Sequence, residues 1–409
     1  MSTHDTIRTR PGPAVDGGGS DATACTACGS SRLVEVLTLA SCPVHVGVLW
    51  PDPDAARACP RGRIRLVWCR GCDFLFNAAF DASLVHYELA YDNALHFSPY
   101  FRDYERGLVA RLVERYDLRG RLIAEAGCGN GHFLGLLCAA GASTGRGYDP
   151  SHDPVGIDPL AAAHATISRE LLTPETAASH DFVVARHVLE HVAEPRAFVR
   201  SLRAALAGHA DAAAYVEVPN ALLALRQRSI WDVIYEHCGY YTAASLVRLF
   251  HAEGFDVLDV HEAYEGQFLG IEARPARPAA APGGHGVPAG EIGHLVASFA
   301  EEFARVRERW DAQLARWRER RERVALWGAG AKATTFMNVL ANASVVDRVV
   351  DLKPAKQGSY LAGTGHEIQA PERLATAPPT RVVLLNPVYR DEVRAALEAM
   401  GLGGVRVVV

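Results

Sequence analysis

The chain has 409 residues, of which 49% are hydrophobic and 22% charged, and its formal net charge is −5. This length predicts two or three domains with sizeable hydrophobic cores. The 47 acidic residues outnumber the 42 basic ones, and charges interrupt every apolar run before it reaches about 20 residues, so neither a general nucleic-acid binder nor a membrane-spanning protein is expected.

Residues 1–21 open the chain with a polar, glycine-rich stretch that contains no apolar run. This composition predicts a disordered tail and argues against a signal peptide, so we expect a cytoplasmic protein. In a reducing compartment, the nine cysteines are expected to be metal ligands or core residues before they are disulfides.

Residues 22–80 carry cysteines, short apolar runs and turn signals, which predict a small β-rich module. Four of the cysteines form two C-x-x-C pairs that 40 residues separate: Cys25, Cys28, Cys69 and Cys72. Each pair presents two thiolates to one tetrahedral ion, so the two pairs together predict a zinc site. Because all four ligand positions would be filled, this zinc is expected to be structural. The alternatives are two chance pairs of core cysteines, or a ligand role for His45.

Residues 81–273 begin with a helical, aromatic stretch at 81–116, after which apolar strand-like runs alternate with amphipathic helical stretches. The predicted strands are 122–125, 145–149, 181–185, 212–218, 255–261 and 267–273. This alternation predicts a doubly wound α/β sheet. Residues 274–290 form a Pro/Ala/Gly-rich stretch without periodicity, which predicts a linker between domains.

A glycine-rich turn follows the first predicted strand of this sheet, and a helix is expected to begin at His132. The turn comprises Glu125, Gly127, Gly129, Asn130 and Gly131. Glycines let the backbone approach a ligand, and a helix N-terminus offers free N–H groups. The spacing resembles motif I of class I S-adenosylmethionine (SAM) methyltransferases, and Asp149 at the end of the next strand suits ribose hydroxyls. A tight turn without a ligand is the alternative.

The predicted strand 181–185 runs into His187 and Leu189. Ligand crevices of open α/β sheets lie at the carboxyl ends of the strands, so both residues are expected to line the cofactor pocket. For His187, and for His191 nearby, a role as a hydrogen-bonded wall of the pocket is favoured over a role in catalysis.

Residues 235–242 bring an acid, an imidazole and three tyrosines together after the strand at 212–218. His237 has an ordinary pKa near neutrality, which suits a general base. Glu236 is expected to orient its neighbours, and the hydroxyls of Tyr235 and Tyr241 are candidates to stabilise an enolate oxygen. A helix cap with a core aromatic patch is the alternative that spacing alone favours.

Residues 291–409 are predicted to form a second α/β unit. A long helix over 291–323 with one apolar stripe comes first, then strands at 323–327, 345–351 and 380–385, with a helix to about 341 after the first strand. The turn after that strand reads Gly328-x-Gly330-x-x-Ala333, and Asp351 ends the next strand. On pattern alone this is a dinucleotide fingerprint, although Lys332 within it can instead meet a phosphate as a point charge.

The chain resembles the SAM-dependent sugar C-methyltransferases of antibiotic deoxysugar and surface-polysaccharide pathways, from Cys25 to the C-terminus. The cysteine pairs match the family's zinc-knuckle module, and residues 125–131 match its methyltransferase domain. Residues 236–242 match its E-H-x-x-Y-Y-[ST] segment. The C-terminal domain of the family matches residues 328–332, 351–358 and 363–365.

This resemblance implies a class I, Rossmann-like methyltransferase core between a zinc-binding N-terminal module and a second Rossmann-like domain that docks the substrate. It implies methylation at carbon of a nucleotide-linked 4-keto-deoxysugar, with His237 as the base that forms the enolate and Glu236 beside it. Tyr91 falls where the family carries an active-site tyrosine. The residues expected to bind substrate are Lys332, Lys356 and Gln357. Ile234 stands where the family has a tyrosine, which bears on the sugar accepted.

Three other functions stay open at this point. They are O- or N-methylation of a natural-product scaffold with the same SAM site, a nicotinamide-dependent reductase that uses the C-terminal fingerprint, and a binding or scaffold protein. Motif I together with Asp149 argues against the last of these. The expected partner is a small molecule, with neither nucleic acid nor membrane, and the protein is expected to be a monomer or homodimer.

Overall fold

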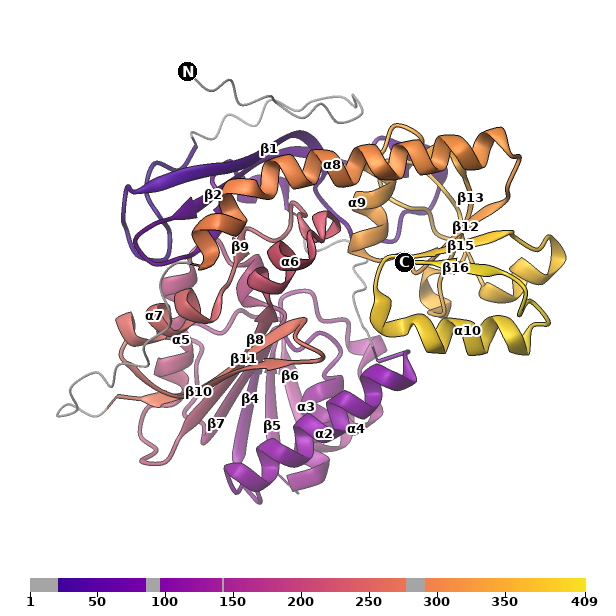
Figure 1. The fold of residues 1–409 in the computed structure, drawn as a ribbon. Coiled ribbons are helices and arrows are strands. Elements are labelled where there is room, and N and C mark those ends of the chain that lie inside the picture. The colour runs from indigo at the N-terminus through magenta and orange to yellow at the C-terminus, as the bar shows by residue number, and fades with distance from the viewer. Residues whose placement is uncertain (1–20, 86–95, 142, 277–290) are drawn as a thin grey trace.

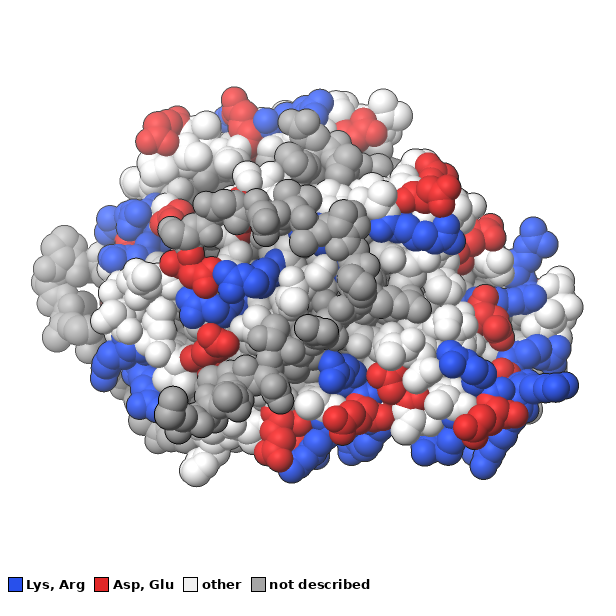
Figure 2. All heavy atoms as spheres, turned by 90° about the horizontal axis from the view of Figure 1, so that it is seen from above, with Lys and Arg blue, Asp and Glu red and all other residues white. Residues whose placement is uncertain are grey.

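A computed structural model of the chain describes residues 21–85, 96–141, 143–276 and 291–409. These residues form a small antiparallel sheet, a large central sheet and a parallel C-terminal sheet, with helices between them (Figure 1). Within the same residues, no helix is both long and apolar enough to cross a membrane. Lysines and arginines alternate with aspartates and glutamates over the face in Figure 2, and its described residues form no broad patch of one charge.

The N-terminal sheet confirms the predicted β-rich module, with one addition from elsewhere in the chain. Its own strands are β1 (Leu33–Pro43), β2 (Arg61–Cys69) and β3 (Leu75–Asn77), with helix α1 (Pro53–Arg57) between the first two. The fourth strand, β9 (Gly239–Tyr240), belongs to the predicted polar and aromatic cluster and pairs antiparallel with β3. The sheet therefore joins the module to the middle of the chain.

The central sheet has the strand order β10-β11-β8-β7-β4-β5-β6 and confirms the doubly wound prediction. Its strands β4, β5, β6, β7 and β8 are parallel to one another. Strand β11 pairs antiparallel with β8, and β10 pairs antiparallel with β11. Their bounds are β4 (Leu122–Ala126), β5 (Thr144–Tyr148), β6 (Ala165–Ser168), β7 (Phe182–Arg186), β8 (Ala213–Pro219), β10 (Phe255–Ala263) and β11 (Phe268–Pro275). The sequence analysis missed β6, a short and partly exposed edge strand, and began the linker within β11.

Helices cover both faces of this sheet, as the alternation of side chains along its strands requires. The helices are α2 (Pro99–Arg115), α3 (His132–Gly141), α4 (Pro159–His164), α5 (Pro195–Ala205), α6 (Ala221–Gln227) and α7 (Ala243–Ala252). Val184 of β7 packs in the core with α2 and α3, whereas its neighbours Val183 and Ala185 pack with α5 and α7. Residues 67–78 of the N-terminal module pack into the α5 and α7 side.

The C-terminal domain is a parallel sheet of order β14-β13-β12-β15-β16. Its elements are α8 (Glu291–Glu319), β12 (Val324–Trp327), α9 (Ala331–Val339), β13 (Val346–Val350), β14 (Ile368–Gln369), β15 (Arg381–Leu384), α10 (Arg390–Ala399) and β16 (Arg406–Val408). The predicted helix 291–323 ends four residues early, and Arg321 just beyond it has a positive φ of 54°. After β13, the sequence analysis predicted only β15 and missed β14, α10 and β16.

Helix α8 joins the N-terminal module to the C-terminal domain rather than belonging to one of them. Its buried stripe, including Phe303 and Leu314, shares one core with β1, β2, α9 and β12 (Figure 1). Beside it, Arg61 of β2 donates to Asn338 of α9 at 3.1 Å. The central domain contacts the C-terminal domain through paired side chains such as Gln267 and Asn386, at 3.0 and 3.2 Å.

Candidate active site

The first glycine turn, residues 127–131, leads from β4 into α3 as predicted. Gly127, Gly129 and Gly131 have φ values of 68°, 55° and 84°, a region that side chains disfavour. A Cβ on Gly131 would lie 2.7 Å from both Ala161 and Ile167, whereas a Cβ on Gly129 would meet nothing within 4 Å. The turn is therefore packed tightly on one side and leaves room for a ligand at Gly129.

Asp149 holds this turn from the end of β5. Its Oδ2 accepts the backbone N–H of Gly129 at 2.8 Å, and its Oδ1 accepts the N–H and the hydroxyl of Ser151 at 2.8 and 2.6 Å. The Asn130 side chain accepts the N–H of His132 at 3.2 Å. The predicted carboxylate thus lies beside the open side of the turn, where hydroxyls of a ribose can reach it.

Glu125 lies buried in β4 just before the turn, and its Oε2 has no hydrogen-bond partner among the described residues. Burial raises the pKa of this carboxyl to about 8, although the charge of Arg186 acts in the opposite direction. A buried acceptor without a partner is costly unless a ligand supplies a donor or a positive charge. The amino group and sulfonium of SAM have that chemistry, so the residues of this turn fit the cofactor.

His187 lies at the carboxyl end of β7, as predicted, in a backbone conformation with φ of 56°. Its ring nitrogens lie 3.7 Å from Glu190 and 3.2 Å from Glu217. Burial would lower the pKa of His187, but the bonds to these two carboxylates outweigh it and raise the pKa to about 9. Leu189 is a correction: its side chain is 0% exposed in the core and presents no surface to a ligand.

Glu217 of β8 was missed by the sequence analysis, although it is the centre of a buried charged network. It is 0% exposed and accepts from Arg186 at 3.0 Å, from Tyr215 at 2.8 Å and from Tyr104. Burial would raise the pKa of Glu217, but Arg186 and then His187 hold it well below its usual range. Arg186 also donates to Glu105 at 2.9 Å. A lone acid within an otherwise apolar strand was the available signal.

His237 lies directly before β9, half-buried, with its ring 4.8 Å from that of His191 and 6.0 Å from that of Tyr240. Burial, followed by the charges of His191, His187 and Lys332, lowers the pKa of His237 well below its ordinary value. The imidazole is therefore neutral near pH 7 and has a free lone pair. It forms no hydrogen bond with the described residues.

Glu236 points away from His237 and toward the N-terminal module. Its Oε2 accepts the N–H of Val46 at 2.8 Å, and its Oε1 lies 3.6 Å from His45 Nδ1. His45 therefore pairs with Glu236, which corrects its weaker candidacy as a metal ligand. The Glu236 side chain anchors the segment that carries His237.

The two tyrosines proposed for the enolate are likewise bonded elsewhere. The Tyr235 hydroxyl accepts the N–H of Asp81 at 2.9 Å. The buried ring of Tyr241 lies 4.8 Å from that of Phe74, and its hydroxyl donates to the carbonyl of Leu189 at 3.4 Å. Both hydroxyls are occupied by backbone groups, which corrects the expectation that they face a reacting oxygen. Tyr91, the third tyrosine predicted for the site, lies outside the described residues.

The four predicted cysteine ligands converge, with all four sulfurs within 4.8 Å of one another. Sγ atoms of Cys25 and Cys72 lie 3.6 Å apart, as do those of Cys28 and Cys69. Tetrahedral zinc with bonds of about 2.3 Å requires sulfurs about 3.8 Å apart, so the cluster fits the ion. Phe74, two residues after the second pair, packs against Tyr241 and so connects this cluster to the segment of His237.

The second glycine turn, residues 328–330, leads from β12 into α9. Gly328 has a φ of 94°. Asp351 Oδ2 accepts the N–H of Ala329 at 2.7 Å, and Lys356 Nζ lies 3.6 Å from the same oxygen. Gln357 donates to the Asp351 carbonyl at 3.1 Å. Lys356 and Gln357 are therefore bonded within the domain, where they shape the turn.

Lys332 at the start of α9 points out of the C-terminal domain toward the central one. It forms an ion pair with Asp232 and lies 3.4 Å from the hydroxyl of Ser229. Both partners immediately precede the His237 segment, and the charge of Lys332 contributes to the lowered pKa of His237. Lys332 at the second turn therefore lies near the segment that carries His237.

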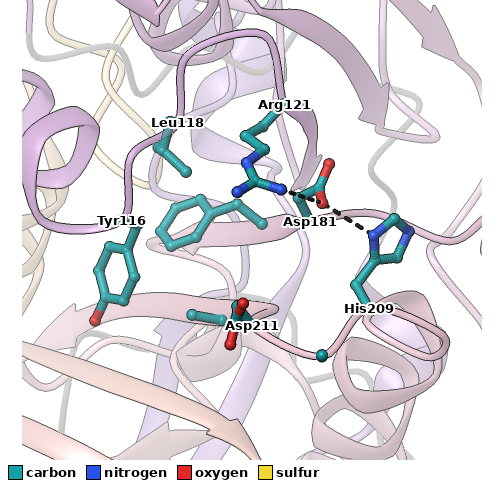
Figure 3. A pocket seen from close by; sticks show the side chains of 9 residues that line it. Tyr116, Leu118, Arg121, Asp181, His209 and Asp211 are labelled. Atoms are coloured by element: carbon teal, nitrogen blue, oxygen red, sulfur yellow. Dashed lines mark hydrogen bonds and ion pairs between the residues drawn. The ribbon is translucent and has the colours of Figure 1, made fainter.

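A separate cavity of about 100 Å³ opens at the opposite edge of the central sheet (Figure 3). Asp181 lies between Arg121 and His209 there, at 3.4 and 2.9 Å, and precedes β7. The amino ends of the strands form this edge, and ligand sites of such sheets lie at the carboxyl ends. The cavity is also too small for a cofactor of several hundred Å³, so we do not place the active site in it.

Known protein families match the central domain and the C-terminal domain of the chain separately. Residues 100–260 match a methyltransferase domain family, and residues 293–409 match the C-methyltransferase C-terminal domain family. The C-methyltransferase NovU of Streptomyces niveus is 28% identical over 397 residues, which cover 90% of each protein.

Solved structures match a smaller part of the chain. The magnesium protoporphyrin IX methyltransferase ChlM from Synechocystis PCC 6803 is 20% identical, with a TM-score of 0.35, over 43% of this chain and 84% of that one. The 1,6-didemethyltoxoflavin-N1-methyltransferase of Burkholderia thailandensis is 15% identical, with a TM-score of 0.35, over 44% of this chain and 82% of that one.

Proposed function

This chain is a SAM-dependent C-methyltransferase, and we propose that it methylates a ring carbon of a nucleotide-linked 4-keto-deoxysugar. The proposal depends on one observation above the others. The ring of His237 lies 4.8 Å from that of His191, which follows the carboxyl end of β7, and the charge of Lys332 at the second turn acts on its pKa. The neutral imidazole is carried by a segment that other parts of the chain hold in place. A base is what carbon methylation needs, because a C–H bond beside a ketone must lose its proton before the carbon becomes a nucleophile.

The proposed reaction uses His237 as the general base. Its lone pair takes the proton from the carbon next to the ketone, and the resulting enolate carbon forms a bond to the methyl group. When bound, SAM would supply this methyl group, and the electrons of its carbon–sulfur bond would stay on the sulfur of a neutral thioether. The proton stays on the imidazole until product release. General-base catalysis by one side chain contributes roughly 100-fold to 10,000-fold to a rate.

Glu236, Tyr235 and Tyr241 are positioning residues in this proposal. Their polar groups bind Val46, Asp81 and Leu189 respectively, and all three side chains are almost fully buried. They fix the backbone on both sides of His237, so the imidazole keeps one orientation toward the substrate. Fixing a catalytic group in this way avoids an entropic cost during the reaction.

The cofactor is proposed to lie on the first turn, with its ribose at Asp149 and its cationic end near Glu125. The nucleotide part of the sugar is proposed to lie on the second turn. There, Lys332 would contact the phosphates while Lys356 and Gln357 hold the turn in shape. Zinc is proposed to bind the four cysteines and to stabilise the module against which Tyr241 packs.

A labelled-methyl transfer assay tests this function. Protein loaded with one Zn²⁺ per chain is incubated with methyl-deuterated SAM and a panel of thymidine-diphosphate 4-keto-deoxysugars, and the products are analysed by mass spectrometry and NMR. We expect the labelled methyl on a ring carbon. Label on oxygen or nitrogen, or an acceptor without a ketone, would contradict the proposal and favour the alternative methylation.

The role of His237 is tested in the same assay. His237→Ala should lower turnover at least 100-fold while SAM affinity, measured by calorimetry, stays the same. The matched control is His294→Ala, because His294 is exposed on α8; this variant should retain full turnover. Full turnover of His237→Ala would remove the base assignment.

A further inference from the structure

A short helical turn, η3 (Leu189–His191), follows β7 and brings two polar residues next to His237. One donor atom from each of Glu190, His191 and His237 lies within 4.8 Å of the other two. The set contains two imidazoles and one carboxylate from segments that are 46 residues apart. The reaction proposed above uses only one of the three.

Glu190 has an unused acceptor at this point. The residue is 2% exposed, and its Oε2 forms no hydrogen bond with the described residues. Burying an acceptor of this kind without a partner is costly, and more so if it is charged. His187 faces the other oxygen, Oε1, so a further cation or donor at Oε2 would remove that cost.

His191 has the arrangement of a metal-binding histidine. Its Nδ1 lies 3.1 Å from the carbonyl oxygen of Glu236, which can only accept a hydrogen bond, so Nδ1 carries the proton. The lone pair is consequently on Nε2. Histidines that bind metals usually donate their other ring N–H to a carbonyl or a carboxylate in this manner, which fixes the orientation of the ring.

We propose that Glu190, His191 and His237 form a second metal site, which takes one divalent transition-metal ion such as Zn²⁺, Co²⁺ or Ni²⁺. Imidazole nitrogens and a carboxylate oxygen are the ligands these ions prefer, at about 2.0–2.2 Å. Tetrahedral bonds of that length place the donors about 3.4 Å apart. The present separations are within 4.8 Å, so the three side chains need to close by at most about 1.4 Å.

The surrounding charges permit an ion at this place. His187 lies 3.7 Å from Glu190, but it lies closer, at 3.2 Å, to the fully buried Glu217. His187 therefore keeps a counter-charge when Glu190 turns to the metal. Lys332 is already paired with Asp232.

The described residues contain another cluster of carboxylates and a histidine, but its buried carboxylate has no oxygen free for a metal ion. Asp259, His261 and Glu272 also bring donor atoms within 4.8 Å of one another. However, both carboxylate oxygens of Glu272 are occupied, one by Arg111 and the other by Arg115 at 2.7 Å. Two guanidinium groups at the carboxylate repel a cation, so this cluster is a control and not a candidate.

An ion at the proposed site affects catalysis through His237. The metal takes the same lone pair that the base uses to accept the substrate proton. Occupancy and turnover therefore exclude each other, and the ion acts as a reversible inhibitor. This consequence rests on the proposed function, whereas the metal site itself does not.

Cobalt titration of protein loaded with one Zn²⁺ per chain tests the site, because the second site must be free of zinc at the start. Zinc binds thiolates more tightly than cobalt in the order of divalent-metal affinities, so the four cysteines stay loaded with zinc. We expect one additional Co²⁺ per chain, seen as a visible d–d absorption band without sulfur charge-transfer bands. Glu190→Gln and His191→Asn should each weaken this binding at least tenfold, and His261→Gln should leave it unchanged.

Each result decides a separate point. Absence of the additional Co²⁺, equal binding by the folded His191→Asn protein, or loss of binding in His261→Gln would overturn the site. Thermal unfolding and SAM binding verify the fold of each variant. His191 is only half-buried, so its variant covers the case in which Glu190→Gln does not fold. Methyl transfer should fall in proportion to cobalt occupancy and recover with a chelator. Full turnover of cobalt-loaded protein would overturn the base assignment of His237 and the inhibition, and leave the metal site in place.

Discussion

The two glycine turns of this chain are built alike and differ in what surrounds them. In each, the N–H of the first glycine donates to the backbone carbonyl of the last residue of the next strand. Gly127 donates to Tyr148 and Gly328 donates to Val350, both at 2.8 Å. In each, the aspartate that follows that strand, Asp149 or Asp351, accepts a backbone N–H of the turn at 2.8 or 2.7 Å. The same scaffold thus occurs once in each α/β domain.

The difference lies in charge and in space. Lys356 neutralises Asp351, whereas Asp149 forms no salt bridge with the described residues. The second turn is two residues shorter, and its Gly330 has an ordinary φ of −100° with no neighbour close to a Cβ. A carboxylate without a cation favours hydroxyl donors, and a turn next to lysines favours anions. The comparison teaches that the fingerprint sets only the backbone, while the residues around it select the ligand.

The largest expected difference between the two turns is the effect of alanine at the last glycine of each, Gly131 and Gly330. Gly131→Ala forces a Cβ against Ala161 and Ile167 at a positive φ, which costs about 2–4 kcal/mol in strain and overpacking. We expect SAM affinity to fall at least 100-fold in calorimetry and the melting temperature to fall. Gly330→Ala should leave SAM affinity within twofold and the melting temperature nearly unchanged. Equal effects of the two variants on SAM affinity would contradict the assignment of the turns.

The roles of the two carboxylates can be compared by replacing Asp149 or Asp351 with asparagine and measuring SAM affinity. Asp149→Asn removes the charge from the hydrogen bonds proposed to reach the ribose, and a charged hydrogen bond contributes about 1.5–3 kcal/mol. We therefore expect SAM affinity to fall about 30-fold. Asp351→Asn removes the counter-charge of Lys356, which should lower the melting temperature and raise KM for the sugar while SAM affinity stays constant. Weakened SAM binding in Asp351→Asn would show that the second turn also serves the cofactor.

The proposed contact between Lys332 and the phosphates of the substrate tests whether the second turn binds the nucleotide sugar. Lys332→Met removes the positive charge at the start of α9, so we expect KM for the nucleotide sugar to rise about tenfold, with kcat and SAM affinity little changed. Lys332→Arg keeps the charge and should recover part of the loss. An unchanged KM for Lys332→Met in steady-state kinetics would remove this residue from the substrate site.

The smallest expected effect is a pH dependence of SAM binding that belongs to the first turn alone. Glu125 has a pKa raised to about 8, so it is protonated at pH 6 and increasingly ionised as the pH rises. A cationic ligand prefers the ionised form, and its binding therefore releases a proton below pH 8. We expect SAM affinity to rise about fivefold between pH 6 and 7.5 in calorimetry at constant ionic strength. Glu125→Gln should bind SAM with no such slope, and a slope that persists in this variant would contradict the assignment.

Local spacing predicted both turns and the four cysteines, because a few neighbouring residues encode each of them. Gly131 must be a glycine for reasons within its own turn, and two cysteines three positions apart can face one ion. The same reasoning could not tell that Tyr235 and Tyr241 point into the protein. Their hydroxyl partners, Asp81 and Leu189, are distant in sequence, and spacing within 235–242 contains no information about them.

The buried charges escaped prediction for a related reason. Glu217 is unremarkable in sequence as one acid in an apolar strand, and only pairing of strands brings Arg186 and His187 to it. Edge elements such as β6 and β14 escaped because their few apolar residues carry a weak periodic signal. The sequence analysis thus found the backbone of both turns and charged residues next to it, such as Asp149 and Lys332, and missed the buried network of Glu217 and Arg186.

The pairing of β9 with β3 sets a limit on how such an enzyme can be recombined. The sheet of the N-terminal module is completed by Gly239 and Tyr240, which follow the proposed base after one intervening residue. If residues 22–80 were exchanged for those of a relative, β9 would have to pair with the relative's strand in place of β3. Tyr241 would have to pack against the relative's residue in place of Phe74. The unit that can be transplanted is therefore discontinuous, since it must include residues 234–242 together with the module.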